Sequence, residues 1–470
     1  CPCWLGVRVR VSPAMATLTS SSSTKADYGS FPKEGPPSKY LPSAGLPPRR
    51  ATWITASVLI IADVIGLGIM GMADAFADLG WVLGFTTCVL MLPLNLYCGL
   101  LVHNAQLRDF PAANSLAEIS REAVGPSCDS FGYWFAAVVV YSFIFFTLGD
   151  YVLSMGTCLK LLFYSTGADY STAIWSLFAA AALLPFSQVR TLNDTRLLLW
   201  VNVGALLISV FVTIAYLISG RPVVGGKGPT AAVSTSLSWT TGVSGVADIA
   251  FAYVGALMYP EIIAEMEEPA DFPKALYVGA PFVLISLMVV GCVGYGYLGS
   301  HASGLLIEAI PSGTGCSAAA SLFLFVHLLI TYLIKGTVLT RWIATKFVAE
   351  CTLDDEAATS CRPRLVWLAL SSAVVFSTYG VAVAVPIFEN LTTLIGAVQT
   401  PLIGFAIPAL FAISGHFRTQ RQVSPLLWVV QIAIVIFGVG FCIVGLAASA
   451  VLVQEAWSSD TDLNAPNGAR

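Results

Sequence analysis

The sequence predicts an all-α polytopic membrane protein with about eleven transmembrane helices. Of the 470 residues, 56% are hydrophobic and only 11% are charged, whereas a soluble domain carries roughly 25% charged residues. The apolar residues also fall in long runs. The stretches 80–102, 395–414 and 426–454 contain no Asp, Glu, Lys or Arg. Each is long enough to cross a bilayer, which needs about 20 apolar residues.

The number of spans follows from the apolar runs and the charged breaks between them. The expected spans are 54–76, 79–102, 131–158, 172–187, 196–218, 243–261, 277–298, 318–340, 365–387, 391–414 and 426–453. With the N-terminus in the cytoplasm, nineteen Lys and Arg residues fall on the cytoplasmic side and four on the other. This bias predicts that orientation, because basic residues collect on the inner side of membrane proteins.

The chain divides into three expected regions. Residues 1–50 are rich in Ser, Pro and basic residues and are expected to form a disordered cytoplasmic tail. Residues 51–453 form the transmembrane domain, and residues 454–470 a short extracytoplasmic tail. We therefore expect an integral multi-pass protein of the plasma membrane or of a vacuolar or other internal membrane. We expect it to be a monomer in the lipid bilayer, with no nucleic-acid partner.

Two spans contain breaks rich in glycine. The first span is interrupted at Gly66 and Gly68, and each glycine costs a helix about 1 kcal/mol relative to Ala. The sixth span is interrupted at Gly255. Unwound backbone inside a membrane is tolerated only where it lines protein or a cavity. Breaks in the first and sixth spans predict two inverted five-helix repeats plus one accessory helix, a LeuT-type arrangement.

Two motifs carry a resemblance to a known family. The first is the segment 65–71 (Ile-Gly-Leu-Gly-Ile-Met-Gly) with 79–84 (Leu-Gly-Trp-Val-Leu-Gly). The second is the segment 251–255 (Phe-Ala-Tyr-Val-Gly) with the acidic stretch 264–276. Together they resemble the amino acid/auxin permease family of amino acid transporters, in the amino acid–polyamine–organocation superfamily. Ala73 departs from the family pattern, which usually has Pro there.

The resemblance implies a secondary active transporter of small neutral amino acids that works by alternating access and is coupled to protons, with sodium as the alternative coupling ion. It implies no enzyme activity and no cofactor, and the sequence contains no cluster of nucleophile and base and no metal motif. A carrier for another small amine or an organic acid is the alternative within the class. An amino-acid sensor that does not transport is the alternative from another class.

The predicted substrate site lies at the two breaks. In the first break, backbone N–H groups would bind the substrate carboxylate, and the opposing interpretation is that the glycines only permit close helix packing. The residues of this half are Ile65, Gly66, Leu67 and Gly68. In the sixth span, backbone carbonyls would bind the substrate ammonium group, and the aromatic rings would either cover the site or simply pack. The residues of that half are Phe251, Tyr253, Val254 and Gly255.

Two ionisable residues are candidates for ion coupling. Asp63 lies at the first break, where a charged carboxylate should face a cavity or take up a proton. The alternative role for Asp63 is to satisfy backbone groups at the break. Lys335 lies in the inner half of the eighth span, where related folds bind sodium, so its ammonium group is a candidate to replace that ion. The alternative is that Lys335 extends to the cytoplasmic surface.

Overall fold

The structure, a computed structural model, describes residues 51–168, 170–188, 195–348, 361–385 and 388–463. These residues form helices, and no β-strand is found among them. The α-helices are α1 (Trp53–Val64), α2 (Met72–Asn104), α3 (Leu116–Val124), α4 (Asp129–Leu162), α5 (Thr172–Phe186), α6 (Thr195–Ile218), α7 (Trp239–Tyr253), α8 (Tyr259–Glu265), α9 (Phe272–Leu298), α10 (Gly315–Phe347), α11 (Cys361–Ala384), α12 (Phe388–Val398), α13 (Ile407–Thr419) and α14 (Pro425–Leu463). The expected tail 1–50 lies outside the described residues.

Each of the eleven expected spans coincides with helices in the described residues. Eight helical segments there are long and apolar enough to cross a membrane, and α1 and α5 are shorter apolar helices. The sixth span is divided between α7 and α8, and the tenth runs through α12, the π-helical segment η7 (Leu402–Ala406) and α13. The last helix, α14, continues to Leu463 and so runs past its expected end at 453. Residues 454–463 therefore extend a helix that we expected to have ended.

The first two spans meet at a sharp corner inside α2. Gly80 has φ 81° and ψ 176°, a backbone conformation that residues with a side chain rarely adopt. A Cβ atom placed there would also lie 2.7 Å from the backbone nitrogen of Ser234. Glycine is therefore required at this corner, which ends the first span and begins the second.

Both expected breaks are present, and they lie next to each other. The first span stops at Val64, and a 3-10 segment, η1 (Leu67–Gly71), leads from the break into α2. A Cβ atom at Gly68 would lie 2.9 Å from Cα of Ala252 in α7, and one at Gly255 would lie 2.7 Å from a methyl group of Val64. The two interrupted helices therefore touch at their breaks, as the inverted-repeat fold predicts.

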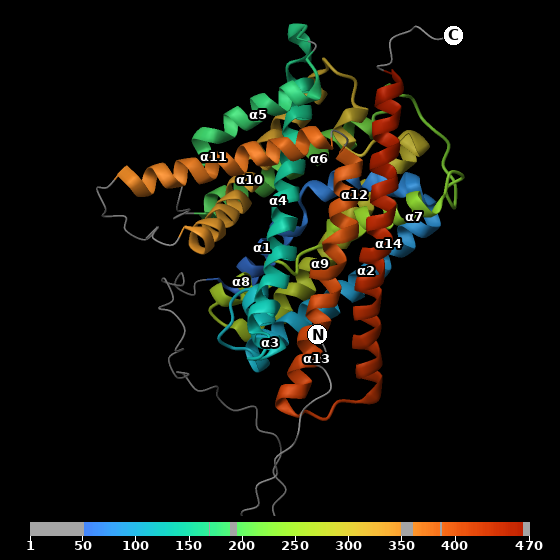
Figure 1. Ribbon diagram of the computed structural model, residues 1–470. Helices are drawn as coiled ribbons and strands as arrows, with labels where there is room; N and C mark the ends of the chain where they lie inside the picture. Colours follow the sequence, from blue (N-terminus) through green and yellow to red (C-terminus); the bar gives the residue numbers. More distant parts are fainter. Residues whose placement is uncertain (1–50, 169, 189–194, 349–360, 386–387, 464–470) are drawn as a thin grey trace, which may run out of the picture. The chain divides into compact units, whose positions relative to one another are not determined.

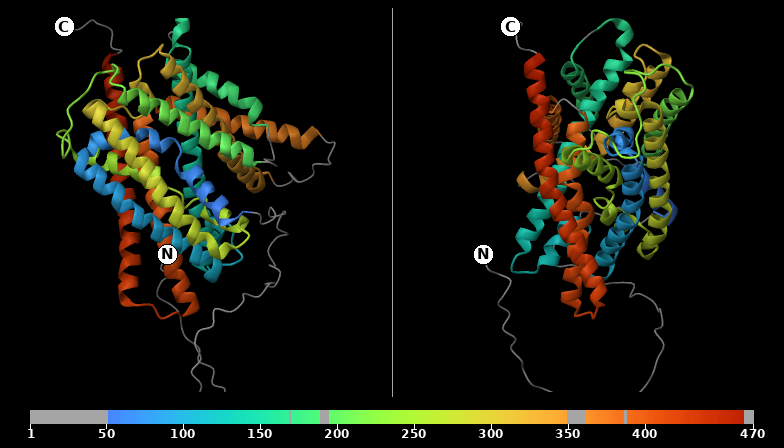
Figure 2. Two further views of the ribbon diagram at one scale, coloured as in Figure 1. Left: turned by 180° about the vertical axis from the view of Figure 1, so that it is seen from behind. Right: turned by 90° about the vertical axis from the view of Figure 1, so that its right-hand side faces the viewer.

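The helices pack in two groups. In the first group α2 packs against α9 and α7, and α1 packs against α9 (Figure 1). In the second group α4 packs against α10, α5 and α11. The beginning of α1 and the end of α8 are also joined, because Ala51 and Met266 form an isolated β-bridge. Figure 2 shows α14 along one side of the molecule, where it packs against α12, α7 and α13.

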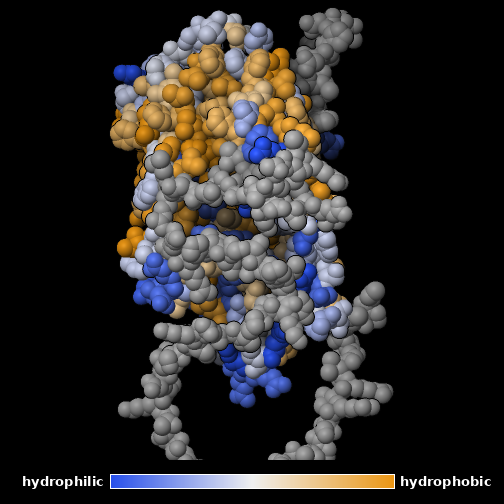
Figure 3. Space-filling model, turned by 90° about the vertical axis from the view of Figure 1, so that its left-hand side faces the viewer, coloured by the Kyte–Doolittle hydropathy of each residue, from blue (hydrophilic) through white to orange (hydrophobic). Residues whose placement is uncertain are grey.

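The outer surface of the second group is apolar. Leu177 and Phe178 of α5 and Leu365, Leu368 and Phe376 of α11 are all exposed. In Figure 3, hydrophobic residues cover the upper part of the face that lies on the left in Figure 1, where α5 and α11 lie. This surface fits contact with lipid, because large exposed apolar patches are rare on soluble monomers.

Candidate functional site

The break in the first span leaves backbone donors without partners. The N–H groups of Ile65 and Gly66 are used, because each bonds to a carbonyl of α1 at 2.8 Å. The N–H groups of Leu67 and Gly68 begin η1 and have no partner in the part of the chain that the structure describes. The first N–H groups of any helix lack such partners. Two donors are therefore available to an anionic group at this point.

The two glycines of the break have different surroundings. A Cβ atom at Gly66 would have the carbonyl oxygen of Asp63 as its nearest neighbour, at an ordinary 3.7 Å. At Gly68 it would lie 2.9 Å from Ala252 and 3.2 Å from the ring of Phe251. Gly68 is thus needed for the packing of η1 on α7, which is the alternative that the sequence left open. Gly66 has no such packing requirement.

The break in the sixth span presents carbonyl oxygens. α7 ends at Tyr253, and the next helix begins only at Tyr259. The carbonyls of Ala252 and Val254 accept no backbone hydrogen bond from the described residues. The C-terminal end of a helix carries partial negative charge, and the N-terminal end partial positive charge. The end of α7 and the beginning of η1 therefore offer complementary charge to a zwitterion.

Two amide side chains fix the sixth span to the second. Asn95 Nδ2 donates a hydrogen bond to the carbonyl of Tyr253 at 3.0 Å. Gln106 Nε2 donates to the carbonyl of Pro260 at 3.0 Å. Gln106 lies in η2 (Ala105–Asp109), the π-helical segment that continues α2. The carbonyls at the end of α7 and in α8 therefore both accept hydrogen bonds from α2 and its extension. Sequence reasoning missed both amides, although a polar Asn95 inside an uncharged apolar run was a usable signal.

The predicted aromatic residues are directed to different partners. The Tyr253 hydroxyl donates to the carbonyl of Cys88 in α2 at 3.0 Å, which gives this side chain an anchoring role away from the break. The ring of Phe251 is buried, and its centroid lies 6.1 Å from that of Phe143 in α4. Val254 is also buried. Phe251 and Val254 are thus buried beside the breaks, whereas the Tyr253 hydroxyl is directed to α2.

Asp63 and Lys335, which the sequence suggested as two separate candidates, form an ion pair. The Lys335 Nζ atom lies 3.5 Å from Oδ1 of Asp63 and donates a hydrogen bond to the Tyr151 hydroxyl at 3.3 Å. The side chains of Lys335 and Asp63 are 12% and 16% exposed, so both are largely buried. Lys335 is therefore directed to the break and not to the cytoplasmic surface. Tyr151 is a further member of the site that the sequence did not indicate.

This ion pair joins the two groups of helices. Asp63 lies in the last turn of α1, whereas Lys335 and Tyr151 lie in α10 and α4. Because α1 packs mainly on α9 and α4 packs on α10, the contact between Asp63 and Lys335 crosses from one group to the other. A change in the charge of either residue would alter the attraction between the groups.

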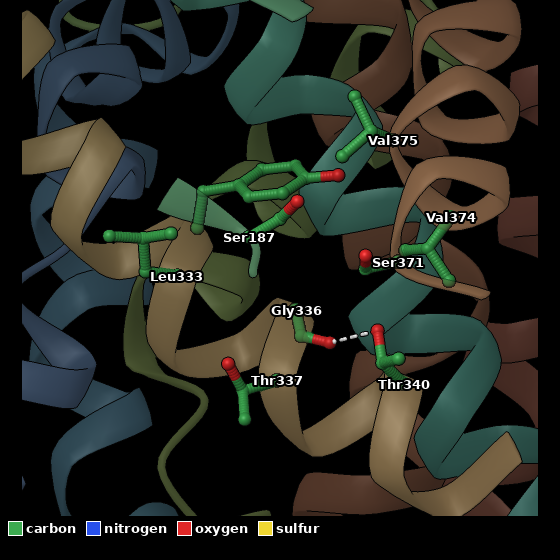
Figure 4. Close-up of a pocket in the computed structure, with 9 residues that line it drawn as sticks. Ser187, Leu333, Gly336, Thr337, Thr340, Ser371, Val374 and Val375 are labelled. Carbon is green, nitrogen blue, oxygen red and sulfur yellow. Dashed lines mark hydrogen bonds between the residues drawn. The ribbon is translucent and has the colours of Figure 1, made fainter. Parts of the chain in front are cut away.

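A pocket lies nearby but away from the breaks. It is enclosed by the end of α5 and by α10 and α11, and Figure 4 shows Thr337, Thr340 and Ser371 around it. The Thr340 hydroxyl donates to the carbonyl of Gly336 at 2.8 Å, drawn as a dashed line. None of the predicted substrate residues lines this pocket. The residues of the two breaks are instead packed against each other, as the close contacts at Gly68 and Gly255 show.

Comparisons with known proteins show the family of the chain. The family model described as "Transmembrane amino acid transporter protein" matches residues 49–451. The chain is 25% identical over 377 residues to amino acid transporter AVT1D of Arabidopsis thaliana, covering 78% of this chain and 65% of the relative. It is 22% identical to the N amino acid transport system protein of Neurospora crassa, covering 79% of this chain and 77% of the relative. These relatives are transporters and not enzymes.

A solved structure confirms the fold. The inward-facing conformation of Mhp1 matches with a TM-score of 0.56 and 13% sequence identity, over 90% of this chain and 94% of that chain. This likeness confirms the expected LeuT-type arrangement, in which the first and sixth spans are broken. The family match covers most of the transmembrane region, and it confirms the resemblance that the two glycine motifs carry. The chain therefore belongs to the transmembrane amino acid transporter protein family.

Proposed function

We propose that this protein carries small neutral amino acids across the membrane by alternating access, with protons as the coupling ion. One observation carries the proposal: Asp63, which pairs with Lys335, lies in the last turn of α1, four residues before the first of the two unpaired N–H groups, those of Leu67 and Gly68. A titratable pair and a substrate site in one place can influence each other. That influence is what coupling between an ion and a substrate requires.

The two breaks fit the two charged ends of an amino acid. The N–H groups of Leu67 and Gly68 would bind the carboxylate, where each charge-assisted hydrogen bond contributes about 1.5–3 kcal/mol. The carbonyls of Ala252 and Val254 would bind the ammonium group. No Arg or Lys is required for the carboxylate, because backbone donors at a helix start suffice in transporters with broken helices.

The side chain of the substrate is expected to be neutral. Around the breaks, the described residues Phe251, Ala252 and Val254 are apolar. The two charged groups there, Asp63 and Lys335, neutralise each other. A charged substrate side chain would therefore have no free partner and would have to leave water unpaired, which is costly.

The same ion pair supports protons over sodium. The Lys335 ammonium group already lies beside the break at 3.5 Å from Asp63, so a sodium ion there would be placed next to a positive charge. A proton needs no such place, because it binds to the Asp63 carboxylate itself. Protonation would remove the attraction to Lys335 and so loosen α1 from α10.

Transport by purified protein in proteoliposomes tests the proposal. We expect radiolabelled small neutral amino acids to accumulate when a pH gradient is imposed and not when only a sodium gradient is present. In Asp63→Asn, exchange of substrate across the membrane should persist while accumulation driven by the pH gradient falls sharply, because position 63 no longer titrates. Accumulation at the wild-type level in this variant would mean that Asp63 is only structural. Substrate binding without any transport would support a sensor.

Substitution of the two glycines separates the substrate site from helix packing. We expect Gly66→Val to lose uptake and to keep its fold, because its side chain would occupy the approach to the backbone N–H groups while its Cβ atom meets the Asp63 carbonyl oxygen at an ordinary 3.7 Å. Gly68→Val should lower thermal stability as well, because it collides with Ala252. Melting curves in detergent and uptake kinetics measure the two effects. Unchanged uptake by a well-folded Gly66→Val protein would rule out this placement of the site.

A further inference from the structure

A second carboxyl group lies inside the transmembrane region, apart from the ion pair. Asp150 in α4 is fully buried, with 0% of its surface exposed. Thr392 of α12 is the side chain that interacts with it, yet neither carboxyl oxygen has a hydrogen-bond partner of ordinary geometry in the described structure. An ionised carboxylate is very costly to bury without a partner. The charge state of this group therefore needs an explanation.

The charged residues on the neighbouring helices do not supply that partner. α10 contributes Lys335, Arg341 and Lys346, α3 contributes Glu118, Arg121 and Glu122, and α11 contributes Arg364. Among the described residues none of them forms an ion pair with Asp150. Lys335 lies on α10, which packs against α4, but its ammonium group contacts Tyr151 and Asp63. The described side chains of α5 and α12 are uncharged.

The described residues give no sign of a metal ion at Asp150, because no group of three or more His, Cys, Asp or Glu side chains that could hold one is found among them. At Gly149 the backbone of α4 lies so close to α11 that a Cβ atom would be 2.7 Å from a methyl group of Val381 and 3.3 Å from the carbonyl of Thr378. A hydrated or multiply coordinated cation needs several oxygen ligands around it. A proton needs no additional space, and it removes the charge directly.

We propose that Asp150 is a second proton-binding site, which holds a proton in this conformation and exchanges it with the aqueous phase on the predicted outer side. The step is a proton transfer alone: the carboxylate takes a proton from water and becomes the neutral acid. The exchange rests on the proposed transport function, whereas the bound proton does not.

The position of α12 explains how water would reach Asp150. α12 packs against α4 on one side and against α7, the predicted outer half of the sixth span, on another. Next to Thr392, the Thr393 hydroxyl donates to Asp248 of α7 at 3.0 Å and bonds with Ser244 of α7 at 2.9 Å. A carrier that opens to the outer side must separate such contacts. That movement would bring water to the α4–α12 interface.

Infrared difference spectroscopy of the purified protein tests the bound proton. Subtracting the spectrum of Asp150→Asn from that of the wild type at neutral pH should reveal the C=O stretch of a protonated carboxylic acid. The matched control, Asp63→Asn, should instead remove carboxylate bands, because Asp63 is paired with Lys335. Loss of carboxylate bands in Asp150→Asn would overturn the proposal, whether or not the protein transports anything.

Two further measurements keep the proposal testable. If Asp150→Asn does not fold, Asp150→Leu takes its place: the spectrum of this variant should lack the C=O stretch of a protonated acid, and a loss of carboxylate bands in its place would overturn the proposal. For exchange, Asp150→Asn should flatten the dependence of substrate exchange on outer pH, removing about one proton from the slope. An unchanged slope in protein that transports would overturn the outer exchange.

Discussion

Asp63 and Asp150 are two carboxyl groups in the membrane-spanning part of this protein that are held in opposite ways. Asp63 lies at a broken helix, is 16% exposed, and has the ammonium group of Lys335 at 3.5 Å. Asp150 lies in the continuous helix α4, is fully buried, and has no hydrogen-bond partner of ordinary geometry in the described structure. The first is stabilised by an opposite charge. The second is stable only without its own charge.

The difference shows how the surroundings assign roles to identical side chains. A paired carboxylate holds two elements together, and it releases them when it is protonated. An unpaired carboxyl stores a proton until water reaches it. Tyr151 stands between the two environments, because it follows Asp150 in α4 and contacts Lys335 through its hydroxyl.

The largest effect is expected from removal of Lys335. In Lys335→Met, Asp63 keeps a charge with no partner, and breaking a largely buried pair costs about 3–5 kcal/mol. Uptake should be lost and the melting temperature in detergent should fall. The double variant Asp63→Asn/Lys335→Met should recover much of the stability, whereas Asp150→Asn/Lys335→Met should not. Equal recovery in both double variants would erase the distinction between the two carboxyls.

A smaller effect is expected from the glycines beside the two acids. Gly149→Ala inserts a methyl group against Val381, and such overpacking costs about 1–3 kcal/mol. In Gly66→Ala the Cβ atom lies at an ordinary 3.7 Å from the nearest atom, the Asp63 carbonyl oxygen, and the protein should melt within experimental error of the wild type. Thermal melts of both variants in the same detergent give the comparison. A stable Gly149→Ala protein would mean that the α4–α11 interface is looser than the structure indicates.

The smallest effect on uptake is expected from Tyr151→Phe. This change removes one hydrogen bond to a charged group, worth about 1.5–3 kcal/mol at most, and leaves the pair of Asp63 with Lys335 in place. We expect uptake to continue, with a shift in its pH dependence, because the Lys335 ammonium group then relies on Asp63 alone. The measurement is the pH profile of uptake at saturating substrate. A profile identical to that of the wild type would exclude Tyr151 from coupling.

The sequence alone was sufficient for the spans and the breaks. Hydrophobic runs determine which segments enter a bilayer, because about 20 consecutive apolar residues match the thickness of its hydrocarbon core. Gly66 and Gly255 mark interruptions, because glycine weakens a helix by a local effect on the backbone. Their places in the first and sixth spans then predicted the inverted-repeat fold, and the structure and the family match agree with that prediction.

Only the tertiary structure decided which side chains meet. Asp63 and Lys335 are far apart in the sequence, so neither segment by itself predicts that their side chains lie 3.5 Å apart. Gly66 and Gly68 are equivalent in sequence terms, yet only Gly68 presses on α7. Asp150 is one polar residue in a long apolar helix until its complete burial and its lack of a hydrogen bond of ordinary geometry are known. Local composition fixes where a helix forms and breaks, whereas distance and desolvation arise only when separate helices pack.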